Sequence, residues 1–354
     1  MIHSHISEAI KEPDLIHLNG NLYFARFESM KVYSTLAAVE YLLESGVVKR
    51  GQTLLDSSSG IYAYALALAC HKYGLNCHIV ASKTVDPALK LQLEILGATV
   101  EPAASAPNLK MDQNNRVRRI QEILQQRDDV HWMQQYHDSI HYLGYREFAC
   151  LLANKFSEEK LTLVGGVGSG CSTGATAGYL REMGRKVSLH GVQPFGSVTF
   201  NSQHVEDPDI IIAGIGSSIP FMNVRASSYD YIHWISFDYS RHGSIELLKK
   251  YAAFSGLSTG SCYTVAQWCA NIFPDDGPCI FIGADLGYRY LEPVFSTYKG
   301  AEDVSNFQPR VIESTNDLSL DWCIMDWRRH GVYCDQDSGS GAIRRDRTAD
   351  LAEV

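Results

Sequence analysis

A glycine-rich segment between a strand and a helix offers the clearest chemistry in the sequence. GGVGSGCSTG, residues 165–174, follows the apolar LTLV and precedes the helical ATAGYLREMGR. Gly168 and Gly170 allow the backbone to approach a ligand closely, and Ser169 and Ser172 add hydroxyl donors. Because N–H groups at a helix start attract anions, the segment predicts a phosphate site. A tight turn without a ligand is the alternative.

A second strand-to-helix turn has similar features. LLDSSSGIYAYALALA, residues 54–69, runs from an apolar strand through three serines and a glycine into an apolar helix. Small hydroxyl residues at such a turn are typical of anion sites. The next residues, Ile61 and Tyr62, are bulky where polar residues are expected. We therefore expect a binding loop whose surroundings have been reshaped.

The order of apolar segments predicts the fold class. Strand-like and helix-like segments alternate, which indicates an α/β protein with mostly parallel sheets. LTLVGGV, the following helix and KVSLHGVQP form a βαβ unit of about 30 residues. Asp86 and Pro87 predict a helix cap and the first helical position. The alternation stops near residue 299, where the chain becomes polar.

The composition is typical of a globular protein and argues against several partner classes. The chain has 354 residues, 45% of them hydrophobic and 20% charged, and a net charge of −9. This charge argues against nucleic acid and anionic membrane surfaces. No apolar run approaches the roughly 20 residues of a membrane span, and the first residues lack signal-peptide features. Nine cysteines without a CxxC pair predict reduced thiols and a cytoplasmic location.

Five motifs together resemble one enzyme family. The SSSG turn, the 165–174 loop, IIIAGIGSSIP (210–220), GLSTGS (256–261) and FIGADLGYRYL (281–291) follow the order found in cysteine synthases. The resemblance begins at residue 14 and ends near residue 298. It implies a divergent member of the cysteine synthase and cystathionine β-synthase family, which is similar to tryptophan synthase β. The implied cofactor is pyridoxal 5′-phosphate (PLP), and the implied architecture is PLP fold type II.

The resemblance also implies a domain organisation of two three-layer αβα domains. Residues 14–31 and 144–298 would form a large PLP-binding domain, and residues 32–143 a small mobile domain with the substrate loop. Residues 299–354 would be a C-terminal extension. We expect the cofactor between the domains, at the carboxyl ends of the strands, and a homodimer as the assembly.

Lys31 is the residue that the resemblance makes catalytic. The family's cofactor lysine lies in a Ser-x-Lys sequence before a long helix, and Ser29-Met30-Lys31 precedes VYSTLAAVEYLLESG here. Lys31 would form the Schiff base with PLP and then accept the Cα proton of the substrate. Without the other motifs, a solvated lysine before an exposed helix would be the simpler interpretation.

The resemblance assigns further cofactor contacts. The residues that would hold the PLP phosphate are Gly168, Ser169, Gly170, Cys171 and Ser172. Ser258 would meet the pyridine nitrogen, although it also fits a helix N-cap. A neutral hydroxyl there leaves the ring largely unprotonated, which disfavours transamination and suits loss of a β-substituent.

The substrate loop departs from the family pattern at its helix end. Ser58, Ser59 and Gly60 match the half of the family loop that binds the substrate carboxylate. Ile61 stands at the family asparagine, which contacts the 3′-oxygen of the cofactor, and Tyr62 follows it. Since Ile61 cannot donate a hydrogen bond, another group must support this oxygen or the cofactor must sit differently.

Other positions on the substrate side are also unusual. Gln135 matches a family glutamine near the substrate carboxylate. Glu28 directly precedes Ser29, so a loop that is usual in the family is missing, and Tyr33 replaces a basic residue. These changes indicate a specialised enzyme rather than a housekeeping cysteine synthase.

The combined features predict a β-replacement enzyme. It would form an aminoacrylate from a β-substituted L-amino acid, such as O-acetylserine or O-phosphoserine, and add a nucleophile. The product would be a non-proteinogenic amino acid such as a diaminopropionate derivative or an S-substituted cysteine. One alternative is β-elimination by a serine or cysteine lyase or dehydratase. Another is a non-catalytic homologue that acts as a scaffold or regulator.

No metal site is expected. Cys323, His330 and Cys334 in WCIMDWRRHGVYC do not follow a zinc spacing. This segment predicts an amphipathic element that docks on the core or on a second subunit. His137 and His141 flank the predicted substrate loop and are expected to be structural, with proton transfer as the alternative.

Overall fold

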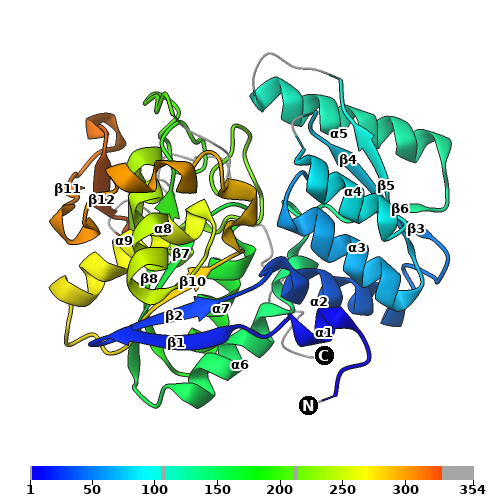
Figure 1. Ribbon diagram of the computed structural model, residues 1–354. Coiled ribbons are helices and arrows are strands. Elements are labelled where there is room, and N and C mark those ends of the chain that lie inside the picture. Colours follow the sequence, from blue (N-terminus) through cyan, green and yellow to red (C-terminus); the bar gives the residue numbers. More distant parts are fainter. Residues whose placement is uncertain (1, 84, 105–108, 210–213, 329–354) are drawn as a thin grey trace, which may run out of the picture.

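Two β-sheets organise the chain, and they lie in separate parts of the molecule (Figure 1). The computed structural model describes residues 2–83, 85–104, 109–209 and 214–328. Within these residues the predicted α/β fold class is confirmed, with one mixed sheet and one parallel sheet.

The larger sheet has eight strands in the order β1-β2-β10-β7-β8-β9-β12-β11. The run from β2 to β9 is parallel, whereas β1 and β12 pair antiparallel with β2 and β9. The bounds of the strands are β1 (Asp14–Asn19), β2 (Leu22–Arg26), β7 (Lys160–Gly166), β8 (Lys186–Gln193), β9 (Tyr231–Ile235), β10 (Cys279–Gly283), β11 (Arg310–Val311) and β12 (Trp322–Asp326).

The smaller sheet has four parallel strands in the order β5-β4-β3-β6. Their bounds are β3 (Thr53–Ser57), β4 (Asn76–Ala81), β5 (Thr99–Pro102) and β6 (Val130–Trp132). The α-helices are α1 (Ile6–Ala9), α2 (Lys31–Glu44), α3 (Ile61–Tyr73), α4 (Pro87–Ile95), α5 (Leu109–Gln126), α6 (Tyr145–Lys155), α7 (Cys171–Glu182), α8 (Phe237–Tyr251) and α9 (Leu257–Ile272). No helix among the described residues is both long enough and apolar enough to span a membrane.

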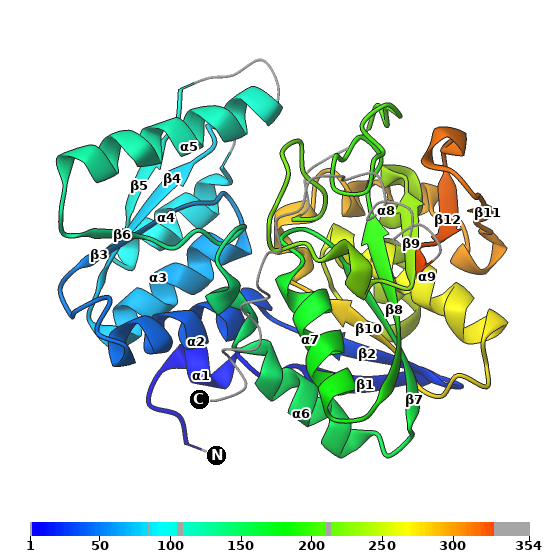
Figure 2. The same ribbon diagram turned by 180° about the vertical axis from the view of Figure 1, so that it is seen from behind.

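Helices cover both faces of each sheet. On the larger sheet, α8 and α9 lie on one face and α6 and α7 on the other (Figures 1 and 2). On the smaller sheet, the adjacent residues Leu54 and Leu55 are both fully buried but belong to different cores. Leu54 packs with α2 and α3, and Leu55 packs with Ile120 and Ile123 of α5, because successive strand residues face opposite sides.

Local sequence signals fix several helix starts. The Asp86 carboxylate accepts the N–H of Leu89 at 2.8 Å, and Pro87 is the first helical residue, as predicted. Helix α7 begins at Cys171, before the predicted ATAGYLREMGR. The reason is Gly170, whose φ of +81° makes the turn by itself, so the next residue already starts the helix.

The chain after residue 299 contributes strands to the larger sheet. β12 pairs with β9 along its whole length, and Trp322 and Cys323 are buried. The aromatic segment therefore lies in the sheet itself instead of docking on its surface. His330 and Cys334 lie outside the described residues.

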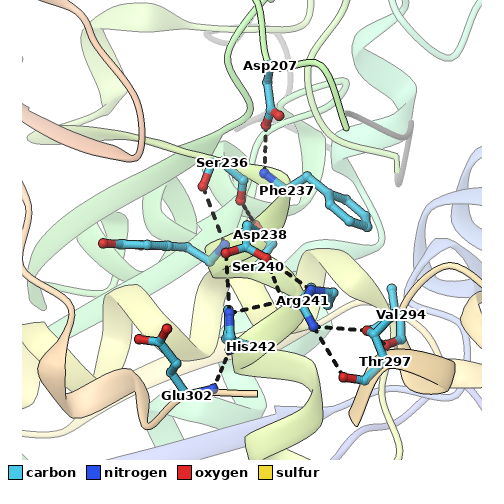
Figure 3. Close-up of polar contacts among 11 residues, drawn as sticks. Asp207, Ser236, Phe237, Asp238, Ser240, Arg241, His242, Val294, Thr297 and Glu302 are labelled. Carbon is cyan, nitrogen blue, oxygen red and sulfur yellow. Dashed lines mark hydrogen bonds and ion pairs between the residues drawn. The ribbon is translucent and has the colours of Figure 1, made fainter. Parts of the chain in front are cut away.

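Polar contacts at the start of α8 hold the chain that leads to β11 (Figure 3). Arg241 donates to the Thr297 hydroxyl at 2.9 Å, and the N–H of Glu302 donates to His242 Nδ1 at 2.6 Å. The first helical N–H, that of Phe237, donates to the Asp207 carboxylate at 2.7 Å. These contacts join α8 to two segments that are distant in sequence.

The close approach of α8 and α9 at Gly260 can be tested by adding a Cβ at this position. A Cβ on Gly260 would lie 2.2 Å from the Ser240 carbonyl oxygen and 2.2 Å from Ser244 Oγ. Gly260→Ala should therefore lower the free energy of unfolding in urea by about 1–3 kcal/mol through overpacking. Gly178→Ala in α7 is the control, because no atom lies within 4 Å of the added Cβ. A Gly260→Ala protein as stable as this control would contradict the close crossing.

Candidate active site

A cavity of about 510 Å³ lies where strands of both sheets end. Its wall includes Ser58 after β3, Gly168 after β7 and Ala284 after β10. Lys31 at the start of α2 and Ser258 in the first turn of α9 also line it. Ligands of α/β proteins bind at the carboxyl ends of the strands, so this cavity is the candidate active site.

Lys31 places a buried amine in the cavity. Its Nζ donates to Ser169 Oγ at 3.1 Å. Burial lowers the pKa of Lys31, and the Cys171 thiol has a smaller opposing effect. A lowered pKa favours the neutral amine, which is the form that attacks a carbonyl or accepts a proton.

The turn after β7 forms a narrow cradle beside this amine. A Cβ at Gly168 would lie 2.2 Å from the Gly214 carbonyl oxygen. A Cβ at Gly166 would lie 2.5 Å from Cγ2 of Ile215. The first turn of α7 follows directly, and its free N–H groups favour an anion. The residues present thus fit a ligand that carries a phosphate and a group able to react with a lysine.

The structure brings most of the predicted cofactor residues to the cavity wall. Gly168, Ser169, Ser172, Ser258 and Lys31 line it.

Gly170 and Cys171 do not line the cavity, in contrast to the other predicted cofactor residues. The Cβ direction of Gly170 meets the Asn223 carbonyl oxygen at 2.8 Å. Cys171 Sγ lies 4.0 Å from the Gln135 carbonyl oxygen, and burial raises the pKa of its thiol. Since α7 begins at Cys171, this side chain packs beside the helix start.

The predicted substrate residues also meet at the cavity. Ser58, Ser59, Gly60, Ile61, Tyr62 and Gln135 all line it. Ser59 Oγ accepts the N–H of Ser82 at 2.7 Å, and Gln135 Nε2 donates to the Ser57 carbonyl oxygen at 2.8 Å. Gly60 is the N-cap of α3 without a side-chain cap, so the first N–H groups of this helix are available to an anion.

Asp56, which sequence analysis missed, supports this loop from behind. It is 2% exposed and accepts the N–H groups of Ser57 at 2.7 Å and Gln135 at 3.0 Å, and Trp132 Nε1 at 3.2 Å. Burial raises the pKa of Asp56 to about 6 even though these hydrogen bonds lower it. A charged residue inside the apolar segment TLLDS was the available signal.

Other polar, charged and aromatic residues of the cavity were also missed. The set comprises Lys83, Asp112, Gln113, Arg116, Tyr136, Phe221, Asp285 and Arg289. Arg289 forms a 2.6 Å ion pair with Asp285, and its Nη1 lies 3.3 Å from a Cβ built on Gly60. These residues come from helix α5, from the loops after β4 and β6, and from loops of the larger sheet, so their convergence depends on the tertiary structure.

His137 and His141, the two histidines near the loop, do not line the cavity. His141 is buried, lies with Nε2 2.8 Å from the Met133 carbonyl oxygen, and contacts the Ser34 hydroxyl at 3.1 Å through Nδ1. Burial lowers the pKa of His141 to about 4. These contacts are those of a structural residue.

A second group of ligand-type side chains lies in the larger sheet, apart from the cavity. His190, His233 and Cys269 are buried with their ligand atoms within 4.8 Å of one another. Trp322 Nε1 donates to His233 Nδ1, so His233 Nε2 carries the hydrogen and donates to His190 Nδ1 at 2.9 Å. A metal ion bound between His190 Nδ1 and His233 Nε2 would force the hydrogen onto His233 Nδ1. That nitrogen already accepts a hydrogen bond from Trp322. The contacts fit a neutral hydrogen-bonded chain.

A buried lysine beside a glycine cradle and a helix start is an arrangement that fits PLP. Residues 21–281 match the family described as "Pyridoxal-phosphate dependent enzyme". The match covers most of the chain, so the protein belongs to this family. The prediction of a PLP-dependent enzyme is thereby confirmed.

Solved structures of similar fold agree with this assignment. The O-acetylserine-dependent cystathionine β-synthase from Helicobacter pylori is 21% identical, with a TM-score of 0.72 over 82% of this chain and 98% of that one. The cysteine synthase from Entamoeba histolytica is 18% identical (TM-score 0.75; 86% and 92%). An O-ureido-L-serine synthase is 19% identical (TM-score 0.73; 86% and 97%). These likenesses show PLP fold type II.

The pKa of Asp56 predicts how stability depends on pH. Because the folded pKa is raised, the folded state holds the proton more tightly than the unfolded state, and stability falls as pH rises through this range. Asp56→Asn removes this titration. The stability of wild type relative to Asp56→Asn should therefore fall by about 2 kcal/mol between about pH 4 and pH 7, measured by urea unfolding. A difference that is constant over this range would contradict the raised pKa.

Proposed function

We propose that the protein catalyses β-replacement on a β-substituted L-amino acid such as O-acetylserine or O-phosphoserine. The product would be a non-proteinogenic amino acid, either a diaminopropionate derivative or an S-substituted cysteine. The supporting observation is one buried amine, Lys31, in the same cavity as the starts of α7 and α3. Each helix start favours one anion, and the two anions of this reaction are the cofactor phosphate and the substrate α-carboxylate.

In this proposal the predicted residues keep the roles that the family resemblance gives them. The cradle at Gly168, with the hydroxyls of Ser169 and Ser172, would hold the phosphate. Gly170 and Cys171 would contribute through the backbone only. Ser258 would meet the pyridine nitrogen. Held there, PLP would supply an electron sink for the substrate Cα, which would make the Cα proton acidic.

The role of Lys31 is to move that proton. Its buried, neutral amine accepts the Cα proton, and the β-substituent leaves with the electron pair of its bond to Cβ. The lone pair of the nucleophile then forms the new bond to Cβ, and the proton of the nucleophile passes to solvent. Lys31 returns its proton to Cα. The net change exchanges one β-substituent for another.

Ser58, Ser59 and Gly60 would bind the α-carboxylate, with Gln135 beside them. Gln135 holds the loop through the Ser57 carbonyl oxygen, and Ser59 is held by the N–H of Ser82. Ile61 and Tyr62 would shape the space for the β-substituent. Ile61 and Tyr62 line the cavity next to this loop, which supports a specialised substrate.

We also propose that residues 32–143 move as the small domain relative to residues 14–31 and 144–298. Among the contacts that join these parts at the cavity, Ser218 Oγ donates to Gln113 Oε1 at 2.8 Å, and Arg289 lies against Gly60. Opening would break both contacts and admit substrate. The homodimer and the cytoplasmic location stay predictions from the sequence.

The role of Lys31 predicts a spectroscopic result. Wild-type protein reconstituted with PLP should absorb near the visible edge, and Lys31→Ala should lack this band. Reduction with borohydride, followed by peptide mass spectrometry, should place a pyridoxyl group on Lys31. Lys83→Ala, at the other lysine of the cavity, should keep the band. A label on Lys83, or a reconstituted wild type without the band, would show that the assignment is wrong.

The reaction type predicts a product ratio. With O-acetylserine and a thiol or amine, most of the consumed amino acid should appear as the β-adduct. Pyruvate and ammonia are the products of elimination, and they should stay minor when the nucleophile is present. The measurement is chromatographic quantification of adduct and pyruvate from one reaction. Pyruvate release that is the same with and without nucleophile would establish elimination instead.

A further inference from the structure

One face of α5 contributes a charged surface to the cavity. Asp112, Gln113 and Arg116 all line it, and Arg116 follows the other two by four and three residues, which puts it on the same side of the helix as each of them. Helix α5 covers the smaller sheet (Figures 1 and 2). The motifs of the sequence do not include these residues, and the proposed β-replacement does not use them.

Arg116 carries a buried positive charge with unused donors. It is 7% exposed, and its Nη1 donates to Ser57 Oγ at 2.9 Å. Its Nε lies 2.9 Å from the Asp112 carboxylate, yet this ion pair lacks hydrogen-bond alignment, so Nε has no hydrogen-bond partner among the described residues. Nη2 makes no hydrogen bond there either. A guanidinium has five N–H donors, and leaving them unpaired in a buried site is costly.

The neighbours of Arg116 do not supply the missing acceptor. Asp112 pairs with Arg116 at Nε and leaves the outer edge of the guanidinium open, and the other carboxylate among the described cavity residues, Asp285, is already paired with Arg289. Lys83 at the exposed edge adds a further cation. A planar donor fork that faces a cavity and is not filled by protein groups is suited to a carboxylate or phosphate of a ligand.

The substrate α-carboxylate has a separate donor set. The free N–H groups of α3 begin after the N-cap Gly60, whereas Arg116 contacts Ser57, which ends β3 before the turn. Arg116 therefore adds a second anion-binding element to the same loop. A simple serine derivative and sulfide would leave this element unfilled.

We propose that Arg116 forms a subsite for a second anionic group, a carboxylate or phosphate, carried by a substrate in addition to its α-carboxylate. This proposal rests on the proposed β-replacement. The anion has two possible sources, the leaving group of the amino acid or the incoming nucleophile. In either case one of the two preferred substrates carries a carboxylate or phosphate that is absent from O-acetylserine and sulfide, apart from the α-carboxylate.

Two substrate pairs test the proposal and separate these sources. The first pair is O-phosphoserine and O-acetylserine with a fixed thiol, and the second is 3-mercaptopropionate and 2-mercaptoethanol with a fixed amino acid. The pair that contains the true source of the anion should respond to Arg116→Gln. In that pair, the kcat/KM of the anionic member divided by that of the neutral member should fall about 10- to 100-fold, mainly through KM. The neutral member should change by less than about twofold. Arg116→Lys, which keeps the charge but loses the fork, should give an intermediate ratio.

Arg118→Gln is the matched control, since Arg118 lies on the same helix but is exposed. It should leave both ratios at the wild-type value. If Arg116→Gln weakens both members of each pair equally, Arg116 holds the α-carboxylate or the fold, and the proposal is wrong. If neither ratio changes, it is wrong as well.

A binding measurement keeps this test independent of turnover. In Lys31→Ala protein, calorimetric titration should show O-phosphoserine binding more tightly than serine, or 3-mercaptopropionate more tightly than 2-mercaptoethanol. Adding Arg116→Gln should abolish that difference. If wild type converts none of the substrates, the proposed function fails, and the titration alone decides whether Arg116 binds an anion. A titration without any preference for the anionic member would overturn the subsite.

Discussion

The burial of one amine between two sheets is the constraint on which the site depends. Removing an ammonium ion from water is costly, and the protein meets this cost by favouring the neutral form of Lys31. The group that accepts its hydrogen bond is a serine hydroxyl. Among the residues that the structure describes, the two carboxylates of the cavity, Asp112 and Asp285, are each paired with an arginine. A carboxylate beside Lys31 would restore the charge and remove the nucleophile.

The same constraint explains why backbone N–H groups at helix starts, rather than charged side chains, attract anions near Lys31. An arginine next to Lys31 would bind a phosphate, but its charge would also perturb the amine and the ring of the cofactor. Backbone N–H groups at α7 and α3 attract anions with only partial charge. Glycines at 166 and 168 let the backbone come close enough to do so, because a Cβ at either position would collide with residues 214–215. The full charges of Arg116 and Arg289 are each held beside a carboxylate.

The features that could be predicted from the sequence are those that depend on residues close together in the chain. The strand-to-helix turns at Gly60 and Gly168, the cap at Asp86 and the alternation of elements depend on neighbouring residues, and the structure contains all of them. The side-chain direction of Cys171 could not be predicted, because it depends on where α7 begins. The positive φ of Gly170 makes this helix begin at Cys171, earlier in the chain than the sequence indicated. Arg116 and Asp285 reach the cavity only through packing of distant elements. The strand β12 was missed because its partner β9 lies about 90 residues earlier in the chain.

Support from behind explains how the substrate loop tolerates Ile61 and Tyr62. Asp56 binds the backbone at Ser57 and Gln135, and Arg116 binds the Ser57 hydroxyl, so the loop is fixed by β3 and α5 before the helix begins. Tyr62 is buried and packs edge-on against His141 at 5.6 Å, which anchors the first turn of α3. Polar side chains at 61 and 62 are therefore not needed to hold the turn. Ile61 is therefore free to shape the cavity wall, while the long-range contacts of the loop hold the turn in place.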